Sequence, residues 1–189
     1  MTRKSILSAL TLLLTSLPSN TFSQSRPTGA TDVTKADIEA VLKHVGPQGV
    51  GVDRQIKVVD AGKYNVGVGI LQRGATKDGS PVTGISHAAV TEVYYVISGS
   101  GTLVTGGTIL DPKPFPSEGE IVKVAVGPSV SGTLQGGERR PVSAGDVVVI
   151  PAGVPHGFSE IKDHVNYLSI RQDGEHVLPS GYVHPALKK

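Results

Sequence analysis

The stretch GDVVVIPAGVPH at residues 145–156 joins a short strand, a tight turn and a histidine in one unit. Its four β-branched residues, Val147 to Ile150, favour a buried strand, and the glycine–aspartate pair before them favours a turn. Pro151 and Gly153 end the strand, because proline cannot donate to a β-ladder and glycine accepts a positive φ angle. His156 is therefore expected just beyond the strand, on a stiff support.

The spacing of these residues resembles the second sequence motif of the cupin family, G-x5-P-x-G-x2-H-x3-N. Four of its five fixed positions are occupied, by Gly145, Pro151, Gly153 and His156. The fifth position, usually asparagine, is Glu160. The resemblance implies a jelly-roll β-barrel, and it predicts that the family's other motif lies upstream.

That first motif, G-x5-H-x-H-x4-E-x6-G, is matched at Gly79, His87, Glu92 and Gly99. One position departs from it, since Ile85 stands where the family has the first histidine of its pair. Both motifs occur in the expected order, and the resemblance spans about residues 79–167.

The resemblance assigns metal binding to His87, Glu92 and His156. Two imidazoles and a carboxylate suit Fe(II), Mn(II), Zn(II), Ni(II) or Cu(II), and they are sufficient for a facial triad with open positions, as in non-haem Fe(II) oxygenases. In one alternative, Glu160 or Ser86 completes the ligand set. In another, the site has lost its metal, and the three side chains are interior polar groups that need hydrogen-bond partners.

The strand that begins at Glu92 fixes which neighbours share its face. Side chains alternate along a strand, so Tyr94 and Val96 are expected on the face of Glu92. If Glu92 points into the barrel, Tyr94 does too. Tyr95 and Ile97 are then expected to pack outward against other elements.

Beyond these motifs, the chain from Val50 to Tyr182 shows a pattern of strands and turns. Its 24 glycines and 13 prolines are enough to separate many short strands and too few to indicate a disordered chain. Strands are expected at 55–60, 64–72, 92–97, 101–105, 121–126, 146–150 and 165–171. This pattern favours an all-β fold, consistent with the cupin-type jelly-roll β-barrel of the resemblance.

The chain divides into a signal peptide, a linker with a short helix, and one cupin domain. The expected bounds are 1–25, 26–49 and 50–189, with an insertion at the barrel rim at about 105–140. Within the insertion, the proline-dense segment 111–116 cannot join a central strand. A helix is expected at 32–44, with Thr34 as its N-cap and Ile38, Val41 and Leu42 as its apolar stripe.

The first residues have the features of a secretory signal peptide. Arg3 and Lys4 precede an apolar run, residues 6–17, that is too short to span a membrane and is followed by small polar residues. Removing residues 1–25 takes away two of the 18 basic residues and none of the 16 acidic ones, which leaves 16 of each. A near-neutral mature chain gives no reason to expect nucleic acid or anionic lipid as a partner.

Other features narrow the range of functions. The chain has no cysteine, so export brings no disulfide framework, and it has no G-x-S-x-G or H-E-x-x-H motif. The expected protein is a secreted or periplasmic cupin that binds a divalent metal and acts on a small organic molecule. The resemblance implies dioxygenase, isomerase or lyase chemistry, with dioxygenase-like enzymes foremost, and a homodimer. The alternative is a non-enzymatic protein that binds or scavenges a small molecule.

We expect the native host to cleave this chain between about Ser23 and Ser25, because the apolar run ends shortly before these small residues. Intact-mass measurement on protein isolated from that host is the test. A mature species that keeps Met1 would contradict this prediction.

Overall fold

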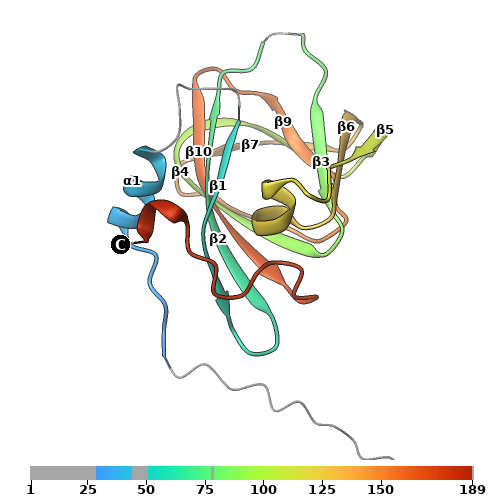
Figure 1. The fold of residues 1–189 in the computed structure, drawn as a ribbon. Helices are drawn as coiled ribbons and strands as arrows, with labels where there is room; N and C mark the ends of the chain where they lie inside the picture. The colour runs from blue at the N-terminus through green and yellow to red at the C-terminus, as the bar shows by residue number, and fades with distance from the viewer. Residues whose placement is uncertain (1–28, 44–50, 78, 189) are drawn as a thin grey trace, which may run out of the picture.

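The computed structural model describes residues 29–43, 51–77 and 79–188, so the predicted signal peptide lies outside the described residues. The described chain consists mainly of strands (Figure 1). Its elements are, in chain order, α1 (Lys35–Lys43), β1 (Val52–Asp60), β2 (Asn65–Gly74), β3 (Thr83–His87), β4 (Val90–Thr105), β5 (Thr108–Pro114), η1 (Val122–Val126), β6 (Ser129–Gln135), β7 (Glu138–Ser143), β8 (Val147–Ile150), β9 (His156–Glu160), β10 (His164–Asp173) and η2 (Pro185–Leu187).

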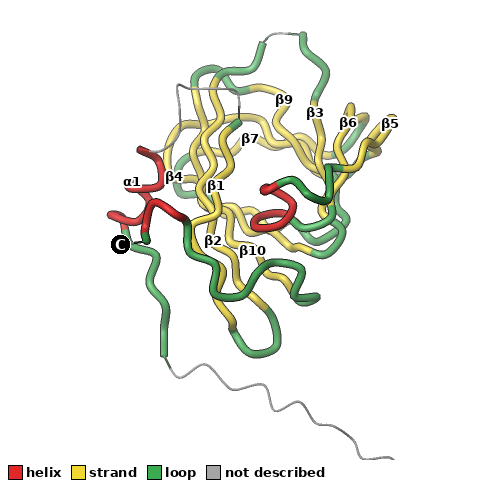
Figure 2. Tube along the Cα trace, in the orientation of Figure 1, coloured by secondary structure: helices red, strands yellow, loops and turns green. Residues whose placement is uncertain are grey.

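The strands form two antiparallel sheets that share β4. One sheet has the order β1-β2-β10-β4-β8, and the other has the order β7-β4-β9-β3-β6-β5. Together they curve into a barrel (Figure 2). The predicted fold class is therefore confirmed: the chain forms an all-β, cupin-type jelly-roll barrel with a short N-terminal helix.

Gly99 lets β4 pass from one sheet to the other. The sequence predicted two strands here, but β4 is one strand of 16 residues that pairs with β8 before Gly99 and with β7 after it. The φ angle of Gly99 is 74°, in the region that favours glycine. A Cβ atom at this position would lie 2.0 Å from the backbone oxygen of His164, so a side chain cannot fit.

The barrel core follows the alternation of the strands. Inward side chains from both sheets form one cluster. It includes Tyr94 and Val96, as the face shared with Glu92 predicted, and also Tyr167. Tyr95 and Ile97 face outward as predicted, but they are 45% and 43% exposed, so no described element covers either of them fully.

The N-terminal helix packs on the outside of the barrel. Asp37 N donates to Thr34 Oγ1 and Thr34 N donates to Asp37 Oδ2, both at 3.1 Å, so the predicted cap is present in reciprocal form. The apolar stripe of α1 covers Ile56 and Ile70 of the first two strands. None of the described helices is long and apolar enough to cross a membrane.

The strand predicted at 121–126 is wrong, because Val122–Val126 form a π-helical turn, η1. Its abundant β-branched residues favour a strand locally. However, the buried residues Val122, Ala125 and Val126 recur at helical spacing, and this face packs inward near β1. Gly127, with a φ angle of 63°, ends the turn. Tertiary packing thus outweighs the local preference.

The segment 105–140 contains β5, η1, β6 and the start of β7. As its prolines predicted, β5 is not central: among the described strands it pairs only with β6, at the edge of its sheet. The register shifts between Leu110 and Lys113, where Asp111 has a φ angle of 47° and Pro112 follows. Proline is tolerated here because this part of the strand does not continue the ladder.

Replacing Gly99 with Ala should lower the free energy of unfolding by about 3 kcal/mol or more, because strained backbone and a backbone clash combine. Gly79 is a matched control, since its φ angle is 72° but a Cβ atom there would meet nothing within 4 Å. Gly79→Ala should cost about 1 kcal/mol. Chemical denaturation measures both, and equal losses would show that β4 does not depend on close approach at Gly99.

Candidate metal centre

The structure brings the three predicted ligands together inside the barrel. His87 ends β3, Glu92 lies near the start of β4, and His156 begins β9. Their exposed fractions are 3%, 1% and 2%, and one potential ligand atom from each lies within 4.8 Å of the others. The fold thus brings His156 to His87 and Glu92 and forms one buried cluster of two imidazoles and a carboxylate.

Both imidazoles approach the same oxygen of the carboxylate. His87 Nε2 lies 3.2 Å and His156 Nε2 lies 3.1 Å from Glu92 Oε2. The two ring centroids are 5.2 Å apart, and the planes are tilted by 57°. The three groups thus converge on one small volume rather than forming separate pairs.

A hydrogen bond on its other nitrogen orients His87. His87 Nδ1 lies 2.8 Å from Ser129 Oγ, and this hydroxyl in turn donates toward Gly127 O (3.0 Å) and Val126 O (3.3 Å). Because the hydroxyl proton is used there, Ser129 accepts from an Nδ1–H group. This hydrogen bond orients the ring so that Nε2 of His87 faces Glu92.

His156 has the same arrangement. Its Nδ1 lies 3.0 Å from the carbonyl oxygen of Val154, which can only accept, so Nδ1 carries a proton. Nε2 of His156 is buried and, although 3.1 Å from Glu92 Oε2, makes no hydrogen bond to any described residue. Nε2 of each histidine therefore faces Glu92 Oε2, where it can carry a proton in the metal-free protein or present its lone pair to a cation.

The carboxylate of Glu92 is held at both oxygens. Oε1 accepts from Ser169 Oγ at 2.7 Å and from Arg171 Nε at 3.0 Å. Oε2 accepts from the Tyr94 hydroxyl at 2.9 Å and otherwise faces the histidines. Since Oε1 already has two donors, Oε2 is the oxygen that remains for a metal.

These neighbours determine the ionisation states of Glu92 and Tyr94. Burial alone would raise the pKa of Glu92, but His156, His87 and the positive charge of Arg171 hold its pKa well below the usual range. Glu92 is therefore ionised at neutral pH. Burial and the charge of Glu92 raise the pKa of Tyr94 well above its usual value, so Tyr94 stays a protonated donor.

Arg171 links Glu92 to the first strand of the barrel. Besides Glu92, its guanidinium donates to Gln55 Oε1 at 2.7 Å and to Asp53 Oδ2 at 2.5 Å, and the whole residue is buried. Glycines of β2 leave room for this long side chain. A Cβ atom at Gly69 would lie 2.7 Å from Arg171 Nη1, and one at Gly67 would lie 2.4 Å from Gln55 Nε2.

Neither of the two alternative ligands completes the cluster. Glu160 is exposed, with its carboxylate 4.0 Å from Lys162 Nζ. Ser86 lines an apolar pocket with Phe115 and lies on the opposite face of β3 from His87. Ile85 shares the face of His87 and stands directly opposite His156 in the β3–β9 pair. The residue that departs from the family motif is therefore next to the cluster.

The sequence reasoning missed the residues that support the ligands. Ser169 and Arg171 lie in the strand predicted at 165–171, at the alternate positions that also hold the buried residues Val165 and Tyr167. A serine and an arginine on the inward face of a strand were a usable signal, because buried polar groups need partners. Ser129 gave no such signal, since it follows a segment predicted with the wrong secondary structure.

No protein-family model matches the chain, and no curated protein matches it either. Solved structures with a similar fold include DMSP lyase DddQ from Ruegeria pomeroyi DSS-3, at 12% identity over 74% of this chain and 54% of that one, with a TM-score of 0.42. The Clostridium difficile EutQ protein has 16% identity over 77% and 82% of the two chains, with a TM-score of 0.39. BH2720 from Bacillus halodurans has 16% identity over 84% and 92%, with a TM-score of 0.44.

The alignment spans about half the length of DddQ, and all three similarities are low.

Replacing Arg171 with Met should lower the free energy of unfolding by about 3–5 kcal/mol, because it leaves the buried Glu92 and the partly buried Asp53 without their cation. Ser169→Ala removes a neutral donor from the same oxygen and should cost about 1 kcal/mol. Chemical denaturation of the metal-free chains compares them. If Arg171→Met is no less stable than Ser169→Ala, Arg171 is not the main support of Glu92.

Proposed function

We propose that this protein is an exported member of the cupin superfamily that binds one divalent metal through His87, Glu92 and His156 and acts on a small organic molecule. The observation that carries the proposal is the convergence of His87 Nε2, His156 Nε2 and Glu92 Oε2 in one buried volume, with His156 Nε2 lacking a well-directed hydrogen bond to any described residue. A divalent cation between these three acceptors would satisfy all of them.

The donor set agrees with this proposal. Two imidazole nitrogens and one carboxylate oxygen suit the borderline transition metals and leave coordination positions open. Each ligand also has the outer support that metal ligands usually have, because both Nδ1 atoms and Glu92 Oε1 are already hydrogen-bonded elsewhere. The chain thus presents preoriented atoms rather than side chains that must reorganise to bind.

A metal held here would supply Lewis-acid polarisation of a bound substrate or activation of O2, as in dioxygenase-like enzymes. The chain's own residues have separate tasks. Arg171 and Ser169 keep Glu92 ionised and in one orientation. Tyr94 keeps a hydroxyl proton within the site, at 2.9 Å from Glu92 Oε2. The apolar cluster around Tyr94 and Tyr167 excludes bulk water.

The second candidate is a non-enzymatic protein that binds or scavenges a small molecule in a degenerate barrel. Ile85 is the residue that favours it, because the family's first motif has a histidine at this position. In that case the protonated imidazoles of His87 and His156 would be the partners of Glu92, and the cluster would serve only the fold.

Metal titration distinguishes the two candidates. Wild-type protein stripped of metal and titrated with Mn²⁺, Fe²⁺ or Zn²⁺ should bind one ion per chain. His156→Ala should weaken binding about 100-fold or more, since three ligands cannot easily spare one. Elemental analysis after dialysis gives the stoichiometry, and circular dichroism shows that the variant is folded. Wild type that retains no metal would favour the non-enzymatic candidate.

Ile85→His provides a second arm of the same experiment. Because position 85 shares the face of His87, a histidine there should add a fourth ligand and tighten metal binding about tenfold or more. Ser86→His is the matched control, since its side chain belongs to the opposite face and should leave the affinity unchanged. Tighter binding in both variants, or in neither, would show that Ile85 does not border the metal.

Export and assembly complete the proposal. Export is supported by the apolar N-terminal run after Arg3 and Lys4. A homodimer is supported by the outer face of β4 and β8, where Val147 and Val149 are 61% and 62% exposed next to Tyr95 and Ile97. Light scattering on the purified chain measures the assembly, and a monomer at all concentrations would exclude the dimer.

A further inference from the structure

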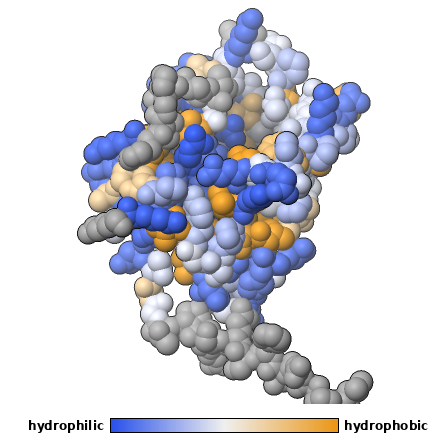
Figure 3. Space-filling model, viewed as in Figure 1, coloured by the Kyte–Doolittle hydropathy of each residue, from blue (hydrophilic) through white to orange (hydrophobic). Residues whose placement is uncertain are grey.

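Arg73 is a charged residue on the inward face of the barrel that the candidate metal centre does not use. Alternate residues of β2 up to Leu71 are buried on this face, and Arg73 is the next residue along it. It stands opposite Val165 of β10, which is fully buried in the barrel core. Hydrophilic side chains cover much of the molecular face shown in Figure 3, where water solvates them. A charge on the inward face instead needs a partner.

One of the three nitrogens of the Arg73 guanidinium has a partner among the described residues. Nε donates to the hydroxyl of Tyr167 at 2.8 Å. Nη1 and Nη2 make no hydrogen bond or ion pair with any described residue, yet neither atom is fully buried. By contrast, all three nitrogens of Arg171 are used. Arg73 therefore presents two unused donors that a bound molecule can reach.

Aromatic side chains connect Arg73 to the candidate metal centre. Arg73 Cζ lies 5.8 Å from the ring centroid of Phe158, which belongs to β9 of the other sheet. The ring of Tyr167 is 4.3 Å from that of Tyr94, which in turn is 6.0 Å from the imidazole of His156. Two rings in contact therefore separate the guanidinium from the nearest expected metal ligand, a distance on the order of 10 Å.

The formal charges of this interior favour an anion once a metal is bound. Glu92, Asp53 and Arg171 form one ion-paired network whose charges sum to minus one. A divalent cation would change this sum to plus one, and Arg73 raises it to plus two. Asp173, which is buried at the other end of β10, lowers it to plus one. A molecule that carries a negative charge is the one that a net positive interior attracts.

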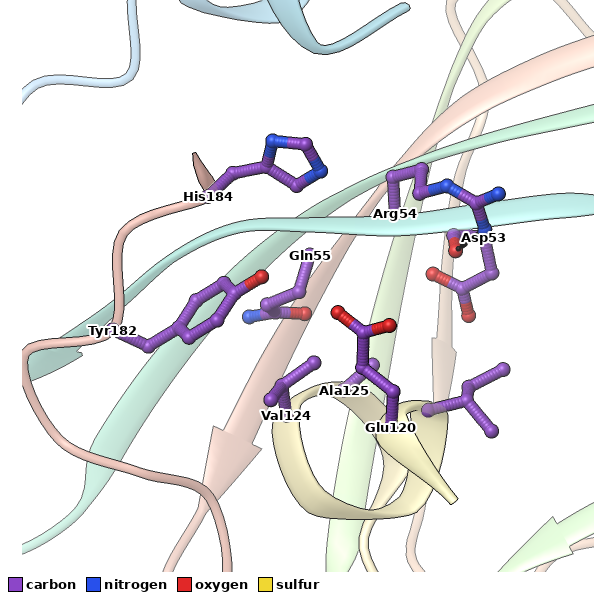
Figure 4. A pocket seen from close by; sticks show the side chains of 9 residues that line it. Asp53, Arg54, Gln55, Glu120, Val124, Ala125, Tyr182 and His184 are labelled. Atoms are coloured by element: carbon purple, nitrogen blue, oxygen red, sulfur yellow. Dashed lines mark hydrogen bonds between the residues drawn. The ribbon is translucent and has the colours of Figure 1, made fainter. Parts of the chain in front are cut away.

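The pocket between β1 and η1 does not suit such an anion (Figure 4). Its volume is about 190 Å³, and the carboxylates of Asp53 and Glu120 line it together with the guanidinium of Arg54. Two carboxylates and one guanidinium leave one net negative charge, which disfavours an anion there. The unused donors of Arg73 are the better partners for a negative group.

We propose that Arg73 determines which small organic molecule the barrel accepts, by binding a carboxylate group of that molecule. This role rests on the function proposed above and names organic acids as the substrate class. Nη1 and Nη2 form a planar fork that matches the two oxygens of a carboxylate. Tyr167 holds Nε and so fixes the orientation of the fork. Phe158, beside the guanidinium, offers an apolar contact to the carbon chain of the acid.

Titration of butyrate into the metal-free full chain at constant ionic strength tests this proposal, with butanamide as the neutral probe of equal length. Butyrate should bind at least tenfold more tightly than butanamide, because its hydrogen bonds to the guanidinium are charge-assisted on both sides. It should also move the backbone NMR resonances of Arg73, Phe158 and Tyr167. Equal binding of the two compounds, or no binding of butyrate, would overturn the proposal.

Three variants locate the carboxylate. Arg73→Gln should weaken butyrate binding about tenfold or more, and Arg73→Lys, which keeps the charge but loses the fork, should bind with intermediate affinity. Arg139→Gln is the matched control, since it removes the same charge from an exposed position of β7 and should leave the affinity unchanged. Circular dichroism shows that each variant is folded. If Arg73→Gln binds butyrate as well as wild type, or Arg139→Gln loses as much, Arg73 does not bind the carboxylate.

Addition of Zn²⁺ separates failure of this proposal from failure of the proposed function. Saturating Zn²⁺ should tighten butyrate binding about threefold or more, because it adds positive charge to the same interior, and the loss caused by Arg73→Gln should persist. Butyrate that binds only with Zn²⁺, and equally well to wild type and Arg73→Gln, would place the carboxylate on the metal and overturn the role of Arg73. If the chain binds no metal, the metal-free titration still decides whether Arg73 binds a carboxylate.

Discussion

The buried ion pair between Glu92 and Arg171 is the interaction on which the interior of this barrel depends. A carboxylate in the interior costs several kcal/mol unless it is paired and hydrogen-bonded. Here Arg171 supplies the charge, and Ser169 and Tyr94 supply further donors. Arg171 itself needs hydrogen-bond partners. It reaches past β2 to Asp53 and Gln55, which both lie on β1.

The pair of Glu92 and Arg171 determines which oxygen of Glu92 faces the two histidines. Because two donors occupy Glu92 Oε1, the other oxygen faces His87 and His156. Each histidine is fixed through its remote nitrogen by a different element, Ser129 of β6 or the carbonyl of Val154 before β9. The geometry of the candidate centre is thus set by residues that would never touch a metal.

The barrel brings these elements together because β4 belongs to both sheets. Glu92 lies in the part of β4 that pairs with β8 and β10, and the histidines lie on β3 and β9 of the other sheet. The bend at Gly99 makes this possible, since no residue with a side chain fits against His164 O. The closed barrel also places β1 near η1, and a polar pocket lies between these two elements.

The sequence by itself determined the all-β class, the outer helix with its Thr34 cap, the inward position of Tyr94 and the three residues of the buried cluster. The first three follow from the local pattern of residues along the chain. The three residues of the cluster were implied by the resemblance of two short motifs to the cupin family. Only the tertiary structure decided that Val122–Val126 are helical and that Arg171 reaches from Glu92 to Asp53. Such features depend on packing between segments distant in sequence, because burial can outweigh a local preference and a buried charge must find its partner wherever the fold places one.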